Sequence, residues 1–343
     1  MTDTSPSDRS VAFVLGGGNA LGAFQAGACC GLLRGGVNPD RIVGSSIGAV
    51  NGALIAGNPP DRRIAALEEF WAQATLPLWA GAASRAAGQA LSMLAGNPAV
   101  YVPTIPGMIA APMGTVGLYD LTPLRRSLAR LVDFGRLNDG GIRFTAVAVD
   151  LETGGEVLFD TARAPVTAEH IAASCAMVPE FKPVEIDGRT LGDGGLTSNL
   201  PLDVLLREPE IAGWCVTIDP FSAHGHPFHS ITEAIVRRQE ILFANHARHL
   251  RDAADREEAL RAALRDVLAL LPAKAASAAA ARRARGLAQG PRLERIDIAW
   301  HSGAESGARL YDYSADALET RWTAGVAAAA VVLGRLRPES AGG

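Results

Sequence analysis

Short apolar runs that lead through glycine-rich turns into apolar helical segments recur in the first part of the chain. Residues 11–15 are apolar and rich in β-branched and aromatic side chains, and a small, apolar segment follows at 22–33. The same arrangement recurs with residues 41–43 and 49–56. Two successive strand–turn–helix units predict a parallel sheet with helices packed against it.

The rest of the sequence adds further strands and helices. Residues 142–150 alternate between apolar and polar, and a Thr-Gly-Gly turn at 153–155 joins them to 156–160, which predicts a β-hairpin. Helices are predicted over 64–74, 168–177, 231–265 and about 315–336, and strands over 184–191 with a turn at 187–188, 213–219 and 292–300. The expected fold is therefore α/β, with a mostly parallel central sheet, helices on both faces and a helical C-terminal extension.

Residues 77–120 show no regular pattern. No charged residue occurs from 86 to 119, and prolines at 98, 103, 106 and 112 exclude a continuous helix through this stretch. Two interpretations stay open. The segment is either a buried connection or a mobile apolar lid over a site that handles lipid.

The pattern predicts one domain with two parts. Residues 1–10 lack the basic start and apolar centre of a signal peptide, and we expect a disordered leader there. Residues 11–220 form the expected core. Residues 221–343 form a mainly helical extension packed on it, which includes an Ala/Arg-rich stretch of low complexity at 272–290.

The net charge and the positions of the cysteines exclude several classes of partner and site. The formal net charge of −4 over 343 residues is far from the basic character of a nucleic-acid-binding protein, so no nucleic-acid partner is expected. The four cysteines have no C-x-x-C spacing, which suggests neither a zinc site nor a disulfide framework and favours the reducing cytoplasm. No stretch offers the roughly 20 apolar residues of a spanning helix, so membrane contact is expected to be peripheral at most.

A serine stands in a tight turn between the second predicted strand and its helix. The turn reads Gly44-Ser45-Ser46-Ile47-Gly48, which has the pattern G-x-S-x-G. Glycines flank the serine because such a turn is too tight for side chains, and the hydroxyl then projects from the sheet over a helix N-terminus. Ser46 is therefore the candidate nucleophile.

A second glycine turn, Gly16-Gly17-Gly18-Asn19, lies between the first predicted strand and its helix. Its bare backbone N–H groups can converge on an anion, which makes it a candidate oxyanion hole. The alternative is a nucleotide-binding loop. The G-x-G-x-x-G spacing fails in both registers, however, and no Gly-Lys-Ser/Thr follows.

The third element is Gly192-Asp193-Gly194-Gly195, which places an acid in a turn after a short strand. Most Asp-Gly pairs are simply turns. With an exposed serine elsewhere in the chain, Asp193 becomes a candidate base.

These three elements, in this order, resemble the patatin-like phospholipases. The matching residues are the loop from Gly17 to Gly27, the turn from Gly44 to Ala49, and Asp193 with Gly194 and Gly195. Further similarity is found in Ala173-Ser174-Cys175-Ala176 with Pro179, Phe181 and Pro183, and in Asn199-Leu200-Pro201-Leu202. The resemblance covers about residues 11–220.

The loop departs from the family pattern at two positions. Asn19 stands where the family has a glycine, and Leu21 stands where a basic residue is often found. Asparagine tolerates left-handed backbone geometry better than other non-glycine residues, which allows the loop to keep its shape.

The resemblance implies a three-layer patatin-like fold and a Ser–Asp dyad that works without histidine, metal or cofactor. Asp193 would accept the proton of Ser46 as the serine attacks an ester carbonyl of a phospholipid or related fatty-acyl lipid. The backbone N–H groups of Gly17 and Gly18, with a further one from Asn19, would stabilise the oxyanion. Gly44, Gly48, Gly194 and Gly195 would shape the two turns.

Three alternatives compete with the dyad. His301 follows Asp193 at a predicted strand end and would complete a Ser–Asp–His triad. His224, His226 and His229, or His246 with His249, would supply a metal site, although no carboxylate stands beside them at convincing spacing. The third alternative is that the chain is a non-catalytic lipid-binding or scaffold protein with the same fold. The Arg/Ala-rich segment 263–285 is compatible with contact to an anionic membrane surface and equally with an exposed helix.

Overall fold

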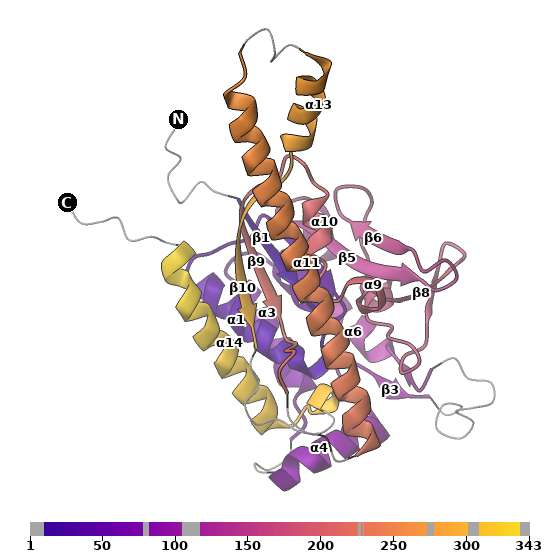
Figure 1. Ribbon diagram of the computed structural model, residues 1–343. Helices are drawn as coiled ribbons and strands as arrows, with labels where there is room; N and C mark the ends of the chain where they lie inside the picture. Colours follow the sequence, from indigo (N-terminus) through magenta and orange to yellow (C-terminus); the bar gives the residue numbers. More distant parts are fainter. Residues whose placement is uncertain are drawn as a thin grey trace.

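The apolar runs of the sequence form the strands of one central sheet (Figure 1). The computed structural model describes residues 10–77, 82–104, 117–225, 228, 230–272, 278–300 and 309–336. The strands of this sheet are β1 (Val11–Leu15), β2 (Arg41–Ser45), β5 (Arg143–Asp150), β6 (Glu156–Asp160), β7 (Val184–Ile186), β8 (Arg189–Asp193), β9 (Ala212–Asp219) and β10 (Arg292–Ala299). A separate small pair joins β3 (Val102–Pro103) to β4 (Tyr119–Asp120).

Within the described residues, the sheet has the strand order β10-β9-β1-β2-β5-β8-β7, and β6 pairs with β5. The five strands from β10 to β5 run parallel, whereas β6, β8 and β7 pair in antiparallel fashion. This confirms the mostly parallel sheet. It also confirms the predicted hairpin of β5 with β6 and the predicted strand pair β7 with β8.

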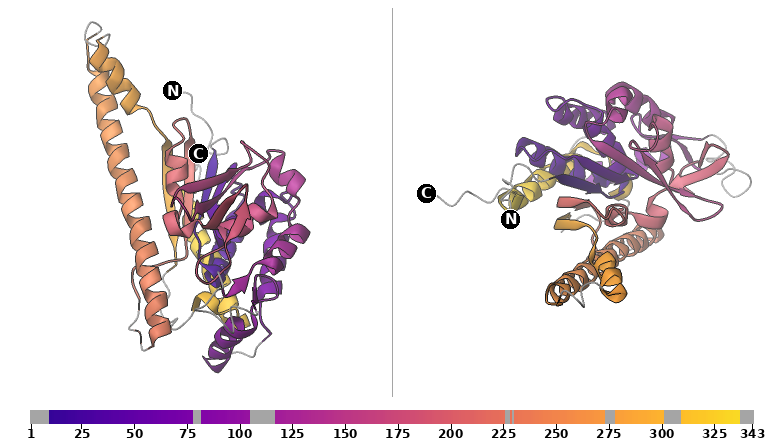
Figure 2. Two further views of the ribbon diagram at one scale, coloured as in Figure 1. Left: turned by 90° about the vertical axis from the view of Figure 1, so that its right-hand side faces the viewer. Right: turned by 90° about the horizontal axis from the view of Figure 1, so that it is seen from above.

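Helices cover both faces of the sheet, as predicted (Figure 2). The helices α1, α2 and α14 belong to one face, and α10 and α11 to the other. The α-helices are α1 (Gly22–Arg34), α2 (Ile47–Ala56), α3 (Arg63–Ala74), α4 (Ala82–Ala95), α6 (Thr122–Leu131), α7 (Phe134–Asn138), α8 (Ala168–Ser174), α9 (Gly195–Ser198), α10 (Leu202–Leu206), α11 (Ile231–Ala269), α13 (Ala279–Ala288) and α14 (Ala315–Leu336). Two short 3₁₀ segments are η2 (Asn19–Leu21) and η3 (Arg309–Tyr311).

Successive side chains of a strand point to opposite faces of the sheet, so the hydrophobic core is divided into two clusters, one on each face. On β1, Phe13 and Leu15 pack into the larger cluster beneath α1 and α2, whereas Ala12 and Val14 pack into a smaller cluster beneath α10 and α11. All four side chains are buried. A central parallel strand must therefore be apolar at every position, which explains its unbroken apolar run.

The segment after residue 220 completes the sheet and its helical cover. β10 pairs with β9 at the parallel edge, and α14 packs closely along α1. The close approach requires glycines. A Cβ on Gly27 would lie 2.2 Å from the carbonyl oxygen of Trp322, and one on Gly325 would lie 2.0 Å from that of Phe24.

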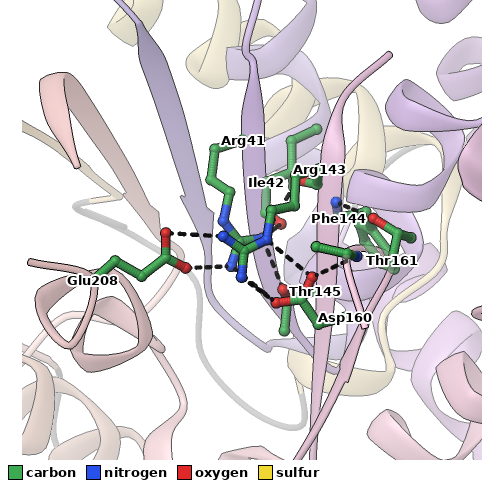
Figure 3. A network of polar contacts seen from close by, with 9 residues as sticks. Arg41, Ile42, Arg143, Phe144, Thr145, Asp160, Thr161 and Glu208 are labelled. Carbon is green, nitrogen blue, oxygen red and sulfur yellow. Dashed lines mark hydrogen bonds and ion pairs between the residues drawn. The ribbon is translucent and has the colours of Figure 1, made fainter. Parts of the chain in front are cut away.

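A partly buried ionic network holds the amino ends of neighbouring strands (Figure 3). Arg41 begins β2 and bonds Thr145 at 2.7 Å and Glu208 at 2.9 Å, and Arg143 begins β5 and bonds Asp160 at 2.6 Å. Arg41 and Asp160 are buried. Because these groups lie where the strands start, the network supports the sheet at the end opposite to the carboxyl ends of the strands.

Two helical segments differ from the sequence-based expectation. The expectation of irregular structure across 77–120 was wrong for α4, which ends before Pro98 and so avoids every proline of that stretch. Residues 105–116 lie outside the described residues, and the lid interpretation stays a prediction. The helix predicted over 231–265 extends to Ala269, and with α13 it forms a hairpin that projects from the body of the molecule (Figure 2).

Candidate active site

The turn after β2 holds Ser46 in a backbone conformation that few non-glycine residues adopt. Its φ is 56° and its ψ is −128°, and helix α2 starts at the next residue. A Cβ on Gly48 would lie 2.1 Å from the carbonyl oxygen of Leu15, and one on Gly44 would lie 2.5 Å from backbone atoms of Gly48. Both glycines are therefore required by close backbone packing. Such strain is found where a side chain must be presented for function.

A second serine secures this turn. The backbone N–H of Ser46 donates to the hydroxyl oxygen of Ser174 at 3.0 Å, and that hydroxyl donates to the carbonyl oxygen of Val147 at 2.5 Å. Ser174 is fully buried at the end of α8. The sequence pattern does not indicate this role, although Ser174 stands in the run Ala173–Ala176 that resembles the patatin-like proteins.

Asp193 ends β8 and faces Ser46 from the neighbouring part of the sheet. Its side chain is 1% exposed, and its Oδ1 accepts a hydrogen bond from the N–H of Gly195 at 2.7 Å. Burial raises the pKa of Asp193 to about 7, against the opposing effects of hydrogen bonds from the Ser46 hydroxyl and the Gly195 N–H. A carboxyl group with a pKa in this range can act as a base near neutral pH.

Gly194 allows the turn after Asp193 to approach the sheet. A Cβ at this position would lie 2.3 Å from the carbonyl oxygen of Val147.

Cys175 is a further neighbour of Ser46. Its thiol is buried and hydrogen-bonded to Ser46, and burial raises the pKa of the thiol well above its usual value. The thiol is therefore a neutral neighbour of the serine.

The glycine loop after β1 lies directly against the nucleophile turn. A Cβ on Gly17 would lie 2.9 Å from the Cβ of Ser46. The N–H of Gly17 donates to the carbonyl oxygen of Asn199 at 3.0 Å. For the N–H groups of Gly18 and Asn19, no acceptor is found among the described residues. Asn19 has a φ of 49°, the left-handed geometry that asparagine tolerates, and its side-chain oxygen accepts a hydrogen bond from the Tyr313 hydroxyl.

A chain of buried polar side chains supports this loop from below. Trp71 donates to Asn51 at 3.0 Å, and Asn51 donates to Gln25 at 2.9 Å. Gln25 in turn donates to the carbonyl oxygens of Gly16 at 3.0 Å and Ile218 at 3.2 Å. Sequence reasoning missed these residues. Their signal is that Gln25 and Asn51 are polar residues inside otherwise apolar helices, where a buried amide must find partners.

Ser46 and Asp193 open into a cleft of about 630 Å³, including the part open to solvent. Its walls are largely apolar and aromatic, and Glu180 and Gln239 add polar side chains to them. The other lining residues are Gly18, Asn19, Ile47, Val50, Val100, Leu121, Leu124, Cys175, Met177, Phe181, Asn199, Phe221, Phe243, Leu310 and Tyr311. The cleft thus combines a serine, a basic carboxylate, backbone N–H donors and room for an apolar chain.

The histidines of the competing interpretations lie away from this cleft or outside the described residues. His301, His226 and His229 fall outside them. His224, His246 and His249 do not line the cleft. In the part of the chain that the structure describes, no group of three or more His, Cys, Asp or Glu side chains is arranged to hold a metal ion.

Among the helices of the described ranges, none combines the length and apolar character needed to cross a bilayer. The longest, α11, spans Ile231–Ala269 and carries charged residues along its length.

Comparison with known proteins adds an independent line of information. Residues 13–206 match a family model described as patatin-like phospholipase, and residues 241–339 match one described as patatin phospholipase. Uncharacterized NTE family proteins of Mycobacterium bovis and Mycobacterium tuberculosis are 29% identical over 196 residues. This match covers 57% of the chain but only 45% of those relatives. The alignment with the crystal structure of VipD from Legionella pneumophila covers 96% of this chain and 67% of the VipD chain. The sequence identity is 13% and the TM-score is 0.44.

Proposed function

The chain belongs to the patatin-like phospholipase family, and on this premise we propose that it is a lipid acyl hydrolase whose catalytic dyad is Ser46 and Asp193. The observation that carries the proposal is the buried carboxyl group of Asp193. Burial raises its pKa to about 7, and it is hydrogen-bonded to Ser46, which lies on a strained turn. This combination serves no evident structural purpose, because a buried carboxylate destabilises the fold.

The dyad would act through a covalent acyl-enzyme. Asp193 accepts the hydroxyl proton of Ser46 as the serine oxygen bonds to the ester carbonyl carbon, and the carbonyl oxygen becomes an oxyanion. When the tetrahedral intermediate collapses, the bond to the alcohol breaks and the proton passes from Asp193 to the leaving oxygen. Water, deprotonated in turn by Asp193, then releases the acyl group as a fatty acid and restores Ser46.

The oxyanion would be stabilised by the glycine loop. The N–H groups of Gly18 and Asn19 are the better donors, since that of Gly17 is already bonded to Asn199. Gly17 contributes by lacking a side chain beside Ser46. The shape of the loop depends on the Gln25–Asn51–Trp71 chain.

An apolar cleft around the nucleophile favours long-chain acyl esters, and phospholipids or related lipids are the proposed substrates. Such substrates reside in membranes, so the proposal includes peripheral membrane contact at the end where the cleft opens. α4 and the start of α11 lie at that end (Figure 1), and they carry Leu94 and Ile231, which are 68% and 81% exposed.

Labelling with a fluorophosphonate ester tests the nucleophile. Wild-type protein should be labelled, and Ser46→Ala should abolish both labelling and ester hydrolysis. Ser45→Ala is the matched control: its hydroxyl is buried without a hydrogen-bond partner among the described residues, so its removal should leave labelling intact. Asp193→Asn should reduce hydrolysis by about three orders of magnitude or more.

Two outcomes would replace the dyad. A loss of several orders of magnitude in His301→Ala would support a Ser–Asp–His esterase, and Asp193→Asn with unchanged hydrolysis would remove Asp193 from the mechanism. A folded wild type that is neither labelled nor active on any lipid or short-chain ester would support a non-catalytic lipid-binding protein.

A further inference from the structure

A second carboxylate, Glu180, lines the cleft from a firmly held segment of backbone. Its carbonyl oxygen accepts hydrogen bonds from the N–H groups of Leu118 and Tyr119 at 3.0 Å and 2.9 Å, and the next residue, Phe181, donates to Met177 at 2.8 Å. The side chain of Glu180 is therefore presented from a fixed position beside β4.

The Glu180 carboxylate is only partly satisfied, by a hydrogen bond from the residue's own backbone N–H. Its Oε2 is buried and has no hydrogen-bond partner among the described residues. Lys, Arg and His are absent from the described lining of the cleft, and Arg238 influences Glu180 only as a nearby charge, without an ion pair. A buried polar group without a partner destabilises the folded protein. In a cleft, a ligand can supply the missing partner of such a group.

Aromatic rings surround the same part of the cleft. Phe181 and Tyr311 line it, and Tyr119 lies behind them with ring centroids 5.7 Å from Phe181 and 6.5 Å from Tyr311. The backbone N–H of Tyr119 is bonded to the Glu180 carbonyl oxygen, and Tyr311 lines the same cleft as Glu180, whose charge raises the pKa of both tyrosines. Aromatic faces beside a carboxylate provide the environment that alkylammonium ions prefer, since both the ring quadrupole and the charge attract a cation.

We propose that Glu180, with Phe181 and Tyr311, forms a subsite for an alkylammonium group in the alcohol part of the substrate. The inference rests on the proposed hydrolase function and deepens it. The ammonium supplies the partner that the buried Glu180 oxygen lacks, and the two carboxylates of the cleft, Glu180 and Asp193, disfavour anionic headgroups through charge repulsion. The cleft thereby selects lipids whose headgroup carries a positive charge.

A pair of soluble esters of the same shape tests the subsite. Butyrylcholine carries a quaternary nitrogen where 3,3-dimethylbutyl butyrate carries carbon, so the ratio of their kcat/KM values reports on charge alone. The wild type should favour butyrylcholine about tenfold or more, a magnitude typical of a desolvated cation beside aromatic rings. Glu180→Gln should bring the ratio close to one, whereas Glu185→Gln, an exposed acid on β7, should keep the wild-type ratio.

Binding of tetramethylammonium, measured by calorimetry, gives a readout that needs no turnover. Wild type and Ser46→Ala should bind it, and Glu180→Gln should bind at least about tenfold more weakly. Methylammonium in the same titration distinguishes a primary from a quaternary ammonium. Thermal melting verifies that Glu180→Gln is folded, which is expected because the substitution keeps the shape of the side chain and removes a partly buried charge.

The outcomes separate the two proposals. A wild type that hydrolyses both esters equally and binds no tetramethylammonium remains a hydrolase but has no ammonium subsite. A wild type that binds tetramethylammonium through Glu180, but is neither labelled by the fluorophosphonate nor active on any lipid or ester, retains the subsite and loses the proposed hydrolase function. If Glu180→Gln binds tetramethylammonium as tightly as the wild type, the assignment to Glu180 is overturned.

Discussion

The chemistry of the site depends on how individual side chains are buried. Asp193 shares a hydrogen bond with Ser46, yet burial outweighs that bond and raises the carboxyl pKa to about 7. The position of Ser46 follows from its positive-φ backbone and from the hydrogen bond to Ser174. The residues that exclude water from Asp193 are therefore expected to matter most for the proposed dyad.

The pH dependence of activity follows from Asp193. The carboxyl group must be ionised to accept a proton, so kcat/KM should rise with pH through about 7 and level off above it. Below that value, each unit of pH should lower kcat/KM about tenfold, because the ionised fraction falls by that factor. The measurement is the initial rate on a neutral soluble ester, with circular dichroism as a control for folding. A profile that stays flat down to about pH 5 would mean an ordinary carboxyl pKa for Asp193.

At the scale of elements, the close packing of α14 on α1 links the C-terminal segment to the site. α1 follows the glycine loop, and the C-terminal segment contacts that loop twice. Arg321 of α14 donates to the carbonyl oxygen of Ala20 at 3.2 Å, and Tyr313, just before α14, bonds Asn19. Any displacement of α14 is therefore expected to reach the candidate oxyanion hole.

Two glycines of α14 offer a matched comparison. Gly325→Ala places a methyl group 2.0 Å from the carbonyl oxygen of Phe24, and overpacking of this kind should destabilise the protein by about 1–3 kcal/mol. Gly334→Ala meets no atom within 4 Å and should stabilise it by up to about 1 kcal/mol through helix propensity. Urea unfolding measures both, and equal effects of the two substitutions would contradict close packing of α14 on α1.

At the scale of the whole molecule, the two ends differ in character. The cleft opens at the carboxyl ends of the parallel strands, the usual ligand side of such sheets. The hairpin of α11 and α13 projects at the other end (Figure 1). Exposed apolar side chains occur at both ends, including Leu94 and Ile231 near the cleft and Leu260 on the hairpin. On the proposed function, we expect Leu94 and Ile231 to contact the membrane and Leu260 to stay away from it.

This difference predicts how charge substitutions act on membrane substrates. Leu94→Glu and Ile231→Glu should each lower the ratio of phospholipid-vesicle hydrolysis to soluble-ester hydrolysis by about tenfold, since each removes about 1.5 kcal/mol or more of apolar contact. Leu260→Glu, 72% exposed on the hairpin, should leave the ratio unchanged. A drop for Leu260→Glu alone would assign membrane contact to the hairpin instead.

Local pattern alone was enough to predict most elements and the principal candidates. Periodicity of apolar residues identifies β1, α1, β2, α2 and the β5–β6 hairpin, because strands and helices repeat with different periods. Ser46 could be nominated because its tight turn requires glycines at neighbouring positions, whereas Asp193 became a candidate base through the serine elsewhere in the chain and the resemblance to the patatin-like phospholipases. The Ala-rich helix α4 was missed, since its weak polarity and the later prolines hid a helix that ends before them.

Local sequence pattern could not predict which residues that are distant in the chain lie close together in the fold. The sheet order β2-β5-β8 brings Asp193, at the end of β8, to Ser46 after β2, and the turn after α9 brings Asn199 to Gly17. The Gln25–Asn51–Trp71 chain and the position of Glu180 likewise depend on how helices and loops pack. Burial, and with it the pKa of Asp193, arises only when these surfaces close together, because desolvation is a property of the whole environment and of no single stretch of sequence.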